Sequence, residues 1–264
     1  MANEQPVAEL ARKTEALRRL HLGGGMLVLP NAWDAASARA FEAAGFPAIA
    51  TSSGGVALAM GYEDHEKAPP AEMIAAATRI TRAVSIPVTV DFEAGYGMPP
   101  GEIVQRLVEV GAAGLNLEDT DHVVGGSLVE ADEQAGKIAA IVEAGRAAGV
   151  PLVVNARVDI FIQRLGPPEE QAAEGLRRAR LYREAGADCI YPILLGDEAV
   201  ISEFVRAVEV INVNLRPGGP LSLQRAAALG VRRVSYAVSL FRETMAALNR
   251  LTSDLKSEVD ALRS

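Results

Sequence analysis

The stretch ADEQAGKIAAIVEAGRAAGVPLVVNA, residues 131–156, contains the repeating unit that decides the fold. Apolar residues recur at helical spacing over Ala131–Ala148, Gly149 follows, and the largely apolar run Leu152–Ala156 comes next. Glycine after a helix adopts, at little cost, the left-handed conformation that ends the helix. An apolar run without alternation is typical of a parallel strand that helices cover on both faces. The stretch therefore predicts a helix followed by a buried parallel strand.

The same alternation of strands and helices continues along the whole chain. We therefore expect an α/β protein, a (β/α)8 TIM barrel that spans residues 1–264 as a single domain. Eight candidate strands carry the pattern: Met26–Pro30, Ala48–Thr51, Val88–Phe92, Gly114–Glu118, Leu152–Ala156, Asp188–Pro192, Val210–Asn214 and Arg233–Tyr236. The amphipathic stretches between them are Asp34–Ala44, Glu72–Val84, Ile103–Val110, Ala131–Ala148, Glu169–Ala185, Ala199–Val208 and Leu221–Ala228.

Helices are also expected at both ends of the barrel. One covers roughly Pro6–Leu20, and the other forms a C-terminal extension over about residues 239–264. The extension suits either a helix folded back on its own barrel or a helix exchanged between the subunits of a homo-oligomer. Its apolar residues fall three or four positions apart: Phe241, Met245, Leu248, Leu251, Leu255, Val259 and Leu262.

Charge and composition exclude several classes of function. The net charge is −8, and no block of Lys and Arg is present, which argues against a nucleic-acid or anionic-membrane partner. No stretch has the ~18 consecutive apolar residues of a membrane span, and Met1–Leu20 lacks the apolar core of a signal peptide, so we expect a cytoplasmic protein. The single cysteine, Cys189, permits neither an internal disulfide nor a zinc cage, and we expect it in the core.

Polar side chains gather where the predicted strands end, at the edge that holds the active site in barrels of this type. Several are carboxylates, which resist ionising together unless a cation lies among them. Oxygen ligands without His or Cys favour Mg2+, or Mn2+, over zinc. The residues are Asn31, Trp33, Asp34, Ser52, Ser53, Gly54, Gly55, Asp64, Asp91, Glu93, Glu118, Asp119, Asn155, Arg157, Asp159, Asn212 and Asn214.

Most of these residues also have a purely structural interpretation. Asp91 and Glu93 suit a loop cap or a salt bridge as well as a metal site, and Asp64 suits a water-mediated ligand. The stretch Ser52–Gly55 is either a flexible turn or a set of backbone N–H groups that hold an anion. Arg157 either pairs with Asp159 or Glu118, or clamps an anionic substrate.

The histidines offer less. We expect His21 at the surface, and His65 and His122 in loops without a metal-binding companion at helical spacing.

Five stretches in this order resemble the isocitrate lyase/phosphoenolpyruvate mutase superfamily, over roughly Met26–Arg242. The resemblance implies a Mg2+-dependent barrel that acts on small 2-oxo or 2-hydroxy acids through a metal-stabilised enolate. It also implies a tetramer, a dimer of dimers, that exchanges its C-terminal helix. The stretches are Pro30–Asp34, Ala50–Ala57 with the later Asp64, Val90–Gly97, Leu115–Asp119 and Asn155–Asp159.

The resemblance also assigns site residues. It places the metal at Asp91, with Glu93, Glu118 and Asp64 around it directly or through water. It places the substrate carboxylate on the backbone of Ser52, Ser53 and Gly54 and on Arg157. We further expect Asp91 and Asn214 to contact the substrate, and Arg157 and Glu118 to act in catalysis.

The segment Thr120–Leu128 departs from the family pattern. Lyases of the family carry a Lys-Lys-Cys-Gly-His-type loop here with a cysteine proton donor, whereas this segment has neither Cys nor Lys. His122 is then the candidate proton carrier, against the alternative of a solvated loop residue. The expected function is a carbon–carbon lyase for a small di- or tricarboxylate. The alternatives are phosphonate or phosphoenolpyruvate chemistry at a P–C bond, and a catalytically weak binder of 2-oxo acids.

Overall fold

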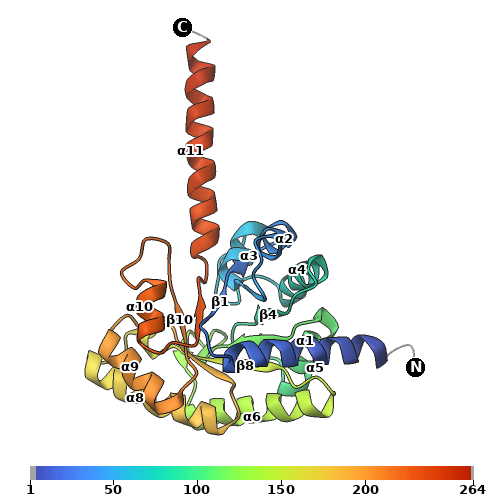
Figure 1. Cartoon of the computed structure of the whole chain (residues 1–264), viewed down its shortest axis with the longest axis vertical. Helices are drawn as coiled ribbons and strands as arrows, with labels where there is room; N and C mark the ends of the chain where they lie inside the picture. The colour runs from blue at the N-terminus through green and yellow to red at the C-terminus, as the bar shows by residue number, and fades with distance from the viewer. Residues whose placement is uncertain (1–3, 263–264) are drawn as a thin grey trace.

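Parallel strands form a closed ring in this protein, whose computed structural model describes residues 4–262 (Figure 1). Strand order is β2-β3-β4-β5-β8-β9 in one sheet and β1-β11-β10 in the other, and a bridge between Ile190 and Ile211 joins them. The strands are β1 (Leu27–Leu29), β2 (Asn31–Ala32), β3 (Ile49–Thr51), β4 (Val88–Asp91), β5 (Gly114–Leu117), β8 (Val153–Val158), β9 (Cys189–Pro192), β10 (Asn212–Asn214) and β11 (Arg233–Ser235).

Pro30 separates β1 from β2, because proline has no N–H to donate to the ladder. Counted as one interrupted strand, β1 and β2 complete a ring of eight parallel strands, each at a predicted position. The α/β class and the TIM-barrel-like architecture are therefore confirmed. Cys189, at the start of β9, is fully buried as expected.

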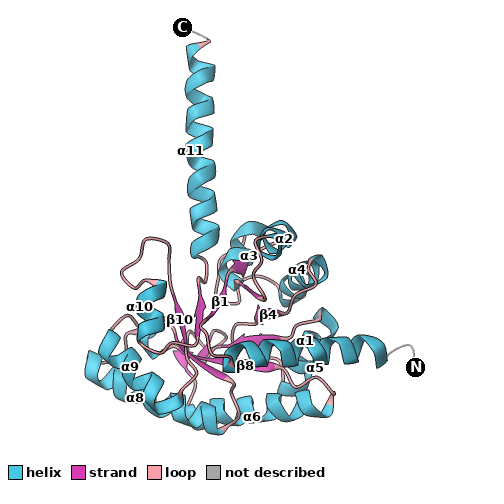
Figure 2. Cartoon of the chain, viewed as in Figure 1, coloured by secondary structure: helices cyan, strands magenta, loops and turns pink. Residues whose placement is uncertain are grey.

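Helices surround this ring (Figure 2). Proline at the first helical position begins α4, α5 and α8, where the missing N–H would have no helical partner anyway. The helices are α1 (Glu4–Leu22), α2 (Ala35–Ala43), α3 (Ser53–Met60), α4 (Pro70–Ala83), α5 (Pro100–Val110), α6 (Ala131–Ala147), α7 (Ile160–Gln163), α8 (Pro168–Glu184), α9 (Glu198–Val208), α10 (Leu223–Ala228) and α11 (Ser239–Ala261). A small antiparallel pair, β6 (Thr120–Asp121) and β7 (Ser127–Leu128), lies after β5.

Helix α1 covers the end of the ring at which the strands begin. Its Leu17 and Leu20 pack in a cluster with Ala48 and Ala113, which directly precede β3 and β5. The other members of the cluster are Leu27, Leu29, Ala50 and Val153. The ring is therefore closed by apolar packing at this end.

The expected surface position of His21 is wrong. The residue is only 1% exposed, because the last turn of α1 packs against the ring. Burial, together with the nearby charge of Arg233, lowers the pKa of His21 to about 3. His21 is therefore a neutral residue of the interior.

Helix α11 extends away from the barrel (Figure 1). Its base is anchored where the ring of Phe241 lies 5.6 Å from that of Trp33, in an edge-to-face contact. No residue of α11 is buried, and Leu251 and Leu255 are 66% and 60% exposed. The helix does not fold back on its own barrel, so that interpretation is wrong.

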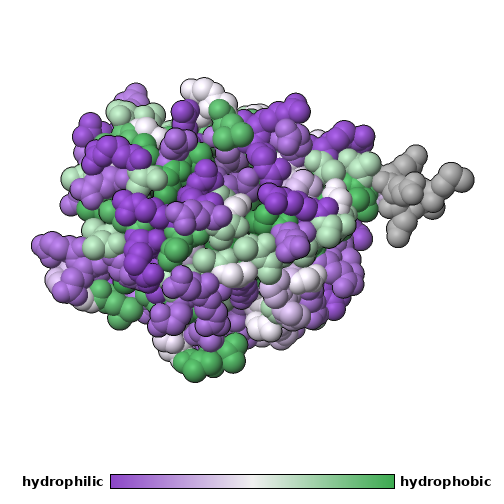
Figure 3. All heavy atoms as spheres, turned by 90° about the horizontal axis from the view of Figure 1, so that it is seen from below, coloured by the Kyte–Doolittle hydropathy of each residue, from purple (hydrophilic) through white to green (hydrophobic). Residues whose placement is uncertain are grey.

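The face turned away from α11 has apolar residues scattered among polar ones (Figure 3). Its surface differs from α11, where exposed leucines follow one another at helical spacing. In residues 4–262, no helix has both the length and the apolar character needed to cross a membrane.

Candidate active site

Asp91 ends β4, and its neighbours hold the backbone and both carboxylate oxygens. The backbone N–H and the hydroxyl of Ser53 donate to Oδ2 at 3.1 and 2.9 Å, and the Asn116 amide donates to Oδ1 at 3.4 Å. The Asp91 N–H donates to the Thr51 hydroxyl at 2.8 Å. Burial raises the pKa of Asp91, and the Arg157 guanidinium opposes that shift. The carboxylate is oriented before any ligand arrives.

Ser52 begins helix α3 and is not part of a flexible turn. Its hydroxyl accepts the Gly55 N–H at 3.1 Å, as an N-terminal cap does, and Ser53–Ala57 are buried. The carboxylate of Asp64 lies against this first turn, since a Cβ at Gly54 would come within 2.5 Å of Asp64 Oδ2. Glycine at position 54 therefore lets Asp64 approach the positive end of the helix.

Glu93 follows β4 in a left-handed conformation, with φ of 48°, and is 2% exposed. The Glu66 N–H donates to its Oε1 at 2.8 Å, and the Tyr96 hydroxyl donates to its Oε2 at 2.5 Å. Burial raises the pKa of Glu93 to about 7, although these hydrogen bonds oppose the shift. This carboxyl group is close to the point of losing its charge at neutral pH.

Arg157, at the end of β8, pairs with two buried carboxylates. Its Nε and Nη2 donate to Asp159 at 2.5 and 2.9 Å, and its Nη1 forms an ion pair with Glu118. Both structural pairings expected for Arg157 are therefore present. Burial raises the pKa of Glu118 well above its usual range. The negative charges of Asp159, Asp91 and Glu93 raise it further, and the Arg157 guanidinium opposes the shift.

His122 binds the same carboxylate, so it is not a solvated loop residue. Its Nε2 lies 2.8 Å from Glu118 Oε2, its side chain is 8% exposed, and its ring lies 5.2 Å from that of His65. These side chains open into a pocket of about 390 Å3. The lining residues are His65, Lys67, Thr120, His122, Gly125, Gly126, Arg157, Ile162 and Gln163.

A second pocket, of about 310 Å3, has Glu118 in its lining. Its lining includes Lys137, whose Nζ donates to the Ala94 carbonyl at 2.6 Å. Burial lowers the pKa of Lys137. Residues of the β6–β7 hairpin line both pockets, whereas Glu118 lines only this second one.

Other residues of the predicted edge have structural roles. Asn214 accepts the Leu194 N–H at 2.9 Å through Oδ1 and so ties down the loop after β9. Asp34 caps α2 in a capping box with Ser37. Asp119 accepts bonds from Arg178, Tyr182 and the Asp159 backbone, and so supports Asp159 from beneath.

The sequence predicted no role for two residues of the site, Tyr96 and Asn116. Tyr96 donates to Glu93, and Asn116 donates to Asp91. Both residues belong to stretches that carry the family resemblance, and this resemblance is the feature of the sequence that points to them. The bond of Tyr96 to a residue three positions earlier depends on a turn with positive φ at Glu93, Gly95 and Tyr96.

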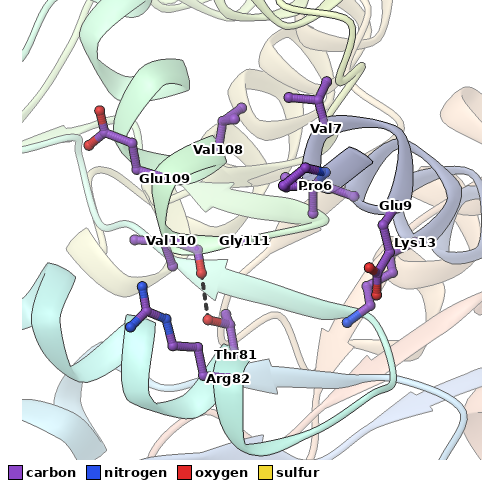
Figure 4. A pocket seen from close by; sticks show the side chains of 11 residues that line it. Pro6, Val7, Glu9, Lys13, Thr81, Arg82, Val108, Glu109, Val110 and Gly111 are labelled. Carbon is purple, nitrogen blue, oxygen red and sulfur yellow. Dashed lines mark hydrogen bonds between the residues drawn. The ribbon is translucent and has the colours of Figure 1, made fainter. Parts of the chain in front are cut away.

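Another pocket, of about 260 Å3, lies between α1 and the C-terminal ends of α4 and α5 (Figure 4). The Thr81 hydroxyl at its wall already donates to the Val110 carbonyl at 2.5 Å. The ionisable residues there have both signs, and none of the predicted site residues lines it. Its lining is Pro6, Val7, Glu9, Leu10, Lys13, Thr81, Arg82, Val108, Glu109, Val110 and Gly111.

The donor set suits a hard divalent cation. Burial raises the pKa of Asp91, Glu93 and Glu118, and the Arg157 guanidinium opposes the shift at Asp91 and Glu118. A cation bound among these carboxyl groups would favour their ionised forms. Within residues 4–262, however, no three His, Cys, Asp or Glu side chains converge as a preformed metal site. The residue types fit Mg2+, which takes few direct carboxylates and keeps waters.

The chain matches a known protein family over most of its length. Residues 17–256, which include the whole ring and most of α11, match the phosphoenolpyruvate phosphomutase family. The chain belongs to this family. The resemblance to the isocitrate lyase/phosphoenolpyruvate mutase superfamily is thereby confirmed.

Named relatives include lyases, mutases and an oxaloacetate acetylhydrolase. The chain is 29% identical over 251 residues to a 2-methylisocitrate lyase of Bacillus subtilis, covering 90% of this chain and 80% of that protein. It superposes on a putative phosphonomutase from Burkholderia cenocepacia J2315 with a TM-score of 0.85 and 38% identity, covering 92% and 99%. For a 2,3-dimethylmalate lyase of the same superfamily, the TM-score is 0.81 at 26% identity, covering 93% and 87%. The family member described here is thus an enzyme, and its relatives support a carbon–carbon lyase.

Proposed function

We propose that this enzyme is a Mg2+-dependent carbon–carbon lyase for a small 2-oxo or 2-hydroxy di- or tricarboxylate. The observation that carries the proposal is the group of three carboxylates, Asp91, Glu93 and Glu118, of which Asp91 and Glu118 interact with the Arg157 guanidinium in the wall of a pocket of about 390 Å3. The relatives named 2-methylisocitrate lyase and 2,3-dimethylmalate lyase support substrates of this class.

The metal would be held by Asp91, with Glu93, Glu118 and Asp64 completing the site directly or through water, and Mn2+ would serve in place of Mg2+. When bound, such a metal supplies a Lewis acid that stabilises the enolate formed as the bond breaks. Asp91 is suited to this position because Ser53 and Asn116 already fix its orientation.

Arg157 would hold the substrate carboxylate in the pocket. Its guanidinium offers planar, paired donors, and Asp159 fixes its orientation through two hydrogen bonds. The first turn of α3, formed by Ser52, Ser53 and Gly54, adds partial positive charge for the same anion. Asn214 would contact the substrate through its Nδ2, since its Oδ1 is engaged by Leu194.

Glu118 and His122 would complete the catalytic group. In the cleavage of a 2-hydroxy acid, a base takes the hydroxyl proton, the carbon–carbon bond breaks, and its electron pair becomes the enolate. A proton then returns to the enolate carbon. His122 lies in the pocket wall and within hydrogen-bond distance of Glu118, so this pair is placed to move these protons.

One observation favours chemistry at a P–C bond as a second candidate. Lys67 lines the same pocket as Arg157, so two cations face the space that a phosphonate would occupy. The structural relative named as a putative phosphonomutase supports this alternative.

A thermal-shift screen followed by product analysis separates these functions. The protein would be heated with Mg2+ and, in turn, 2-oxo acids, 2-hydroxy di- and tricarboxylates, and phosphonates, because a ligand of the native state raises its stability. A Mg2+-dependent shift with release of pyruvate, glyoxylate or succinate is expected. A shift without product would indicate a binding protein, and a shift confined to phosphonates would indicate the P–C enzyme.

We also propose that α11 completes a homo-oligomer, a tetramer built as a dimer of dimers, by packing on another subunit. The support is its row of exposed apolar residues, including Leu248, Leu251 and Leu255, on a helix that leaves its own barrel. Covering such residues with a second copy removes apolar surface from water.

A further inference from the structure

Arg233 lies at the start of β11 and is fully buried inside the ring. Among residues 4–262, no carboxylate forms an ion pair with it, and its Nε has no hydrogen-bond partner. An unpaired charge in the interior is expensive. A leucine or valine would fill the position at lower cost, so the guanidinium calls for a functional explanation.

The guanidinium holds the side chains above and below it. Its Nη1 lies 3.3 Å from His21 Nε2, and His21 Nδ1 lies 2.8 Å from the Leu17 carbonyl oxygen. A carbonyl only accepts, so Nδ1 carries the proton of the neutral ring, and Nε2 is left to accept from Arg233. Helix α1 thus holds one side of the guanidinium.

The other side of the guanidinium determines the orientation of Asn116. Arg233 Nη2 and Asn155 Nδ2 both donate to Asn116 Oδ1, at 3.1 and 2.8 Å. Two donors at the oxygen require the amide nitrogen to point the other way, where it donates to Asp91 Oδ1 at 3.4 Å. A continuous series of hydrogen bonds therefore connects α1 to Asp91 through the inside of the barrel.

We infer that Arg233 is a positioning residue for the active site, which orients Asp91 through Asn116. The inference rests on the proposed function, in which Asp91 is the principal metal ligand. Residues behind a metal ligand typically change metal affinity 10- to 100-fold when they are removed.

The test is a titration of Mn2+, followed by the electron paramagnetic resonance signal of the free ion. Arg233→Met and Asn116→Ala are each expected to weaken Mn2+ binding roughly 10- to 100-fold. The double variant is expected to have the same Mn2+ affinity as the single variant with the lower affinity, because both substitutions interrupt the same series of hydrogen bonds. Affinity of Arg233→Met within twofold of the unsubstituted protein, or additive effects, would overturn the inference.

Leu27→Ala is the matched control. Leu27 pairs with Arg233 in the register of β1 and β11 and is buried, but it lies outside the polar series. The variant is expected to unfold at lower urea concentration with unchanged Mn2+ affinity. If Leu27→Ala also loses affinity, Arg233 has only a packing role.

A crystal structure of Arg233→Met provides a readout independent of metal. The Asn116 amide is expected to turn away from Asp91, and an unchanged Asn116–Asp91 contact would contradict the inference. If the unsubstituted protein binds no Mn2+ while the Asn116 amide turns in the variant, the proposed metal-dependent function fails and the positioning role stands.

Discussion

At the scale of single residues, the site is built from charges that are buried before any ligand binds. Arg157 is 7% exposed and lies between Glu118 and Asp159, which are 2% and 0% exposed. Such pairs contribute little net stability when complete, but removal of one partner leaves the other charge without compensation. Each of these residues is therefore part of the folded structure as well as of the proposed site.

Replacing Arg157 by alanine is expected to abolish ligand-dependent thermal shifts and to lower the free energy of unfolding by about 3–5 kcal/mol. Urea unfolding measures the second effect. Arg177→Ala is the control, since Arg177 forms an exposed pair with Glu174 and should lose less than about 1 kcal/mol. Full ligand binding by Arg157→Ala would contradict the role proposed for the guanidinium.

His21 predicts a pH dependence of stability. The pKa of this side chain is about 3 in the folded protein, against 6.5 for a solvent-exposed histidine, so below pH 6.5 the unfolded chain binds a proton that the folded chain does not. Stability is therefore lost as pH falls from 6.5 towards 3, by about 2 kcal/mol at pH 5. His21→Gln is expected to lose correspondingly less stability on that change.

Urea unfolding of the unsubstituted protein and of His21→Gln at pH 8 and pH 5 isolates the contribution of His21 to the pH dependence of stability. The difference at pH 8 reports the packing effect of the substitution, and all other titrating groups are shared. An equal loss of stability between pH 8 and pH 5 in the two proteins would show that His21 takes up a proton in the folded state.

At the scale of elements, the strands could be predicted because each is a short apolar run followed by polar residues at one edge. Helix α3 could not, because Ser52–Gly55 has the composition of a turn, and the helix depends on burial against the ring. The hairpin of β6 and β7 has only two residues in each strand and leaves no periodic signal.

The same distinction holds for the site. Asp91 and Glu118 lie at the ends of predicted strands, and Glu93 and Arg157 directly follow them, so their position at one edge could be anticipated. Arg233 could not be assigned, since the sequence does not show that an arginine within an apolar run points into the ring. Its role depends on contacts with α1 and β5, which are distant along the chain.

Gly54→Ala tests the approach of Asp64 to α3. The added methyl would come within 2.5 Å of Asp64 Oδ2, so the carboxylate is expected to move and Mn2+ affinity to fall. Because the Asp64 side chain can rotate away, the substitution should lower the free energy of unfolding by only about 1 kcal/mol. Gly136→Ala is the matched control: nothing lies within 4 Å of its added Cβ, and alanine within α6 should raise stability by about 0.5–1 kcal/mol.

At the scale of the whole molecule, α11 is the feature that its own barrel does not explain. Truncation after Arg250 removes Leu251, Leu255 and Leu262 and is expected to lower the mass of the oligomer in sedimentation experiments. The substitution Ser253→Ala, within the same helix, should leave the mass unchanged. An unchanged mass after truncation would show that this part of α11 takes no part in assembly.

The apolar closure formed by α1 has a kinetic consequence. Leu17 and Leu20 close one end of the ring, so both fragments of a cleaved substrate must leave by the end at which the substrate entered. The fragment nearer to this open end of the barrel is released first. In steady-state assays of the proposed lyase, the fragment that departs last should inhibit competitively with substrate, and the one that departs first should inhibit noncompetitively.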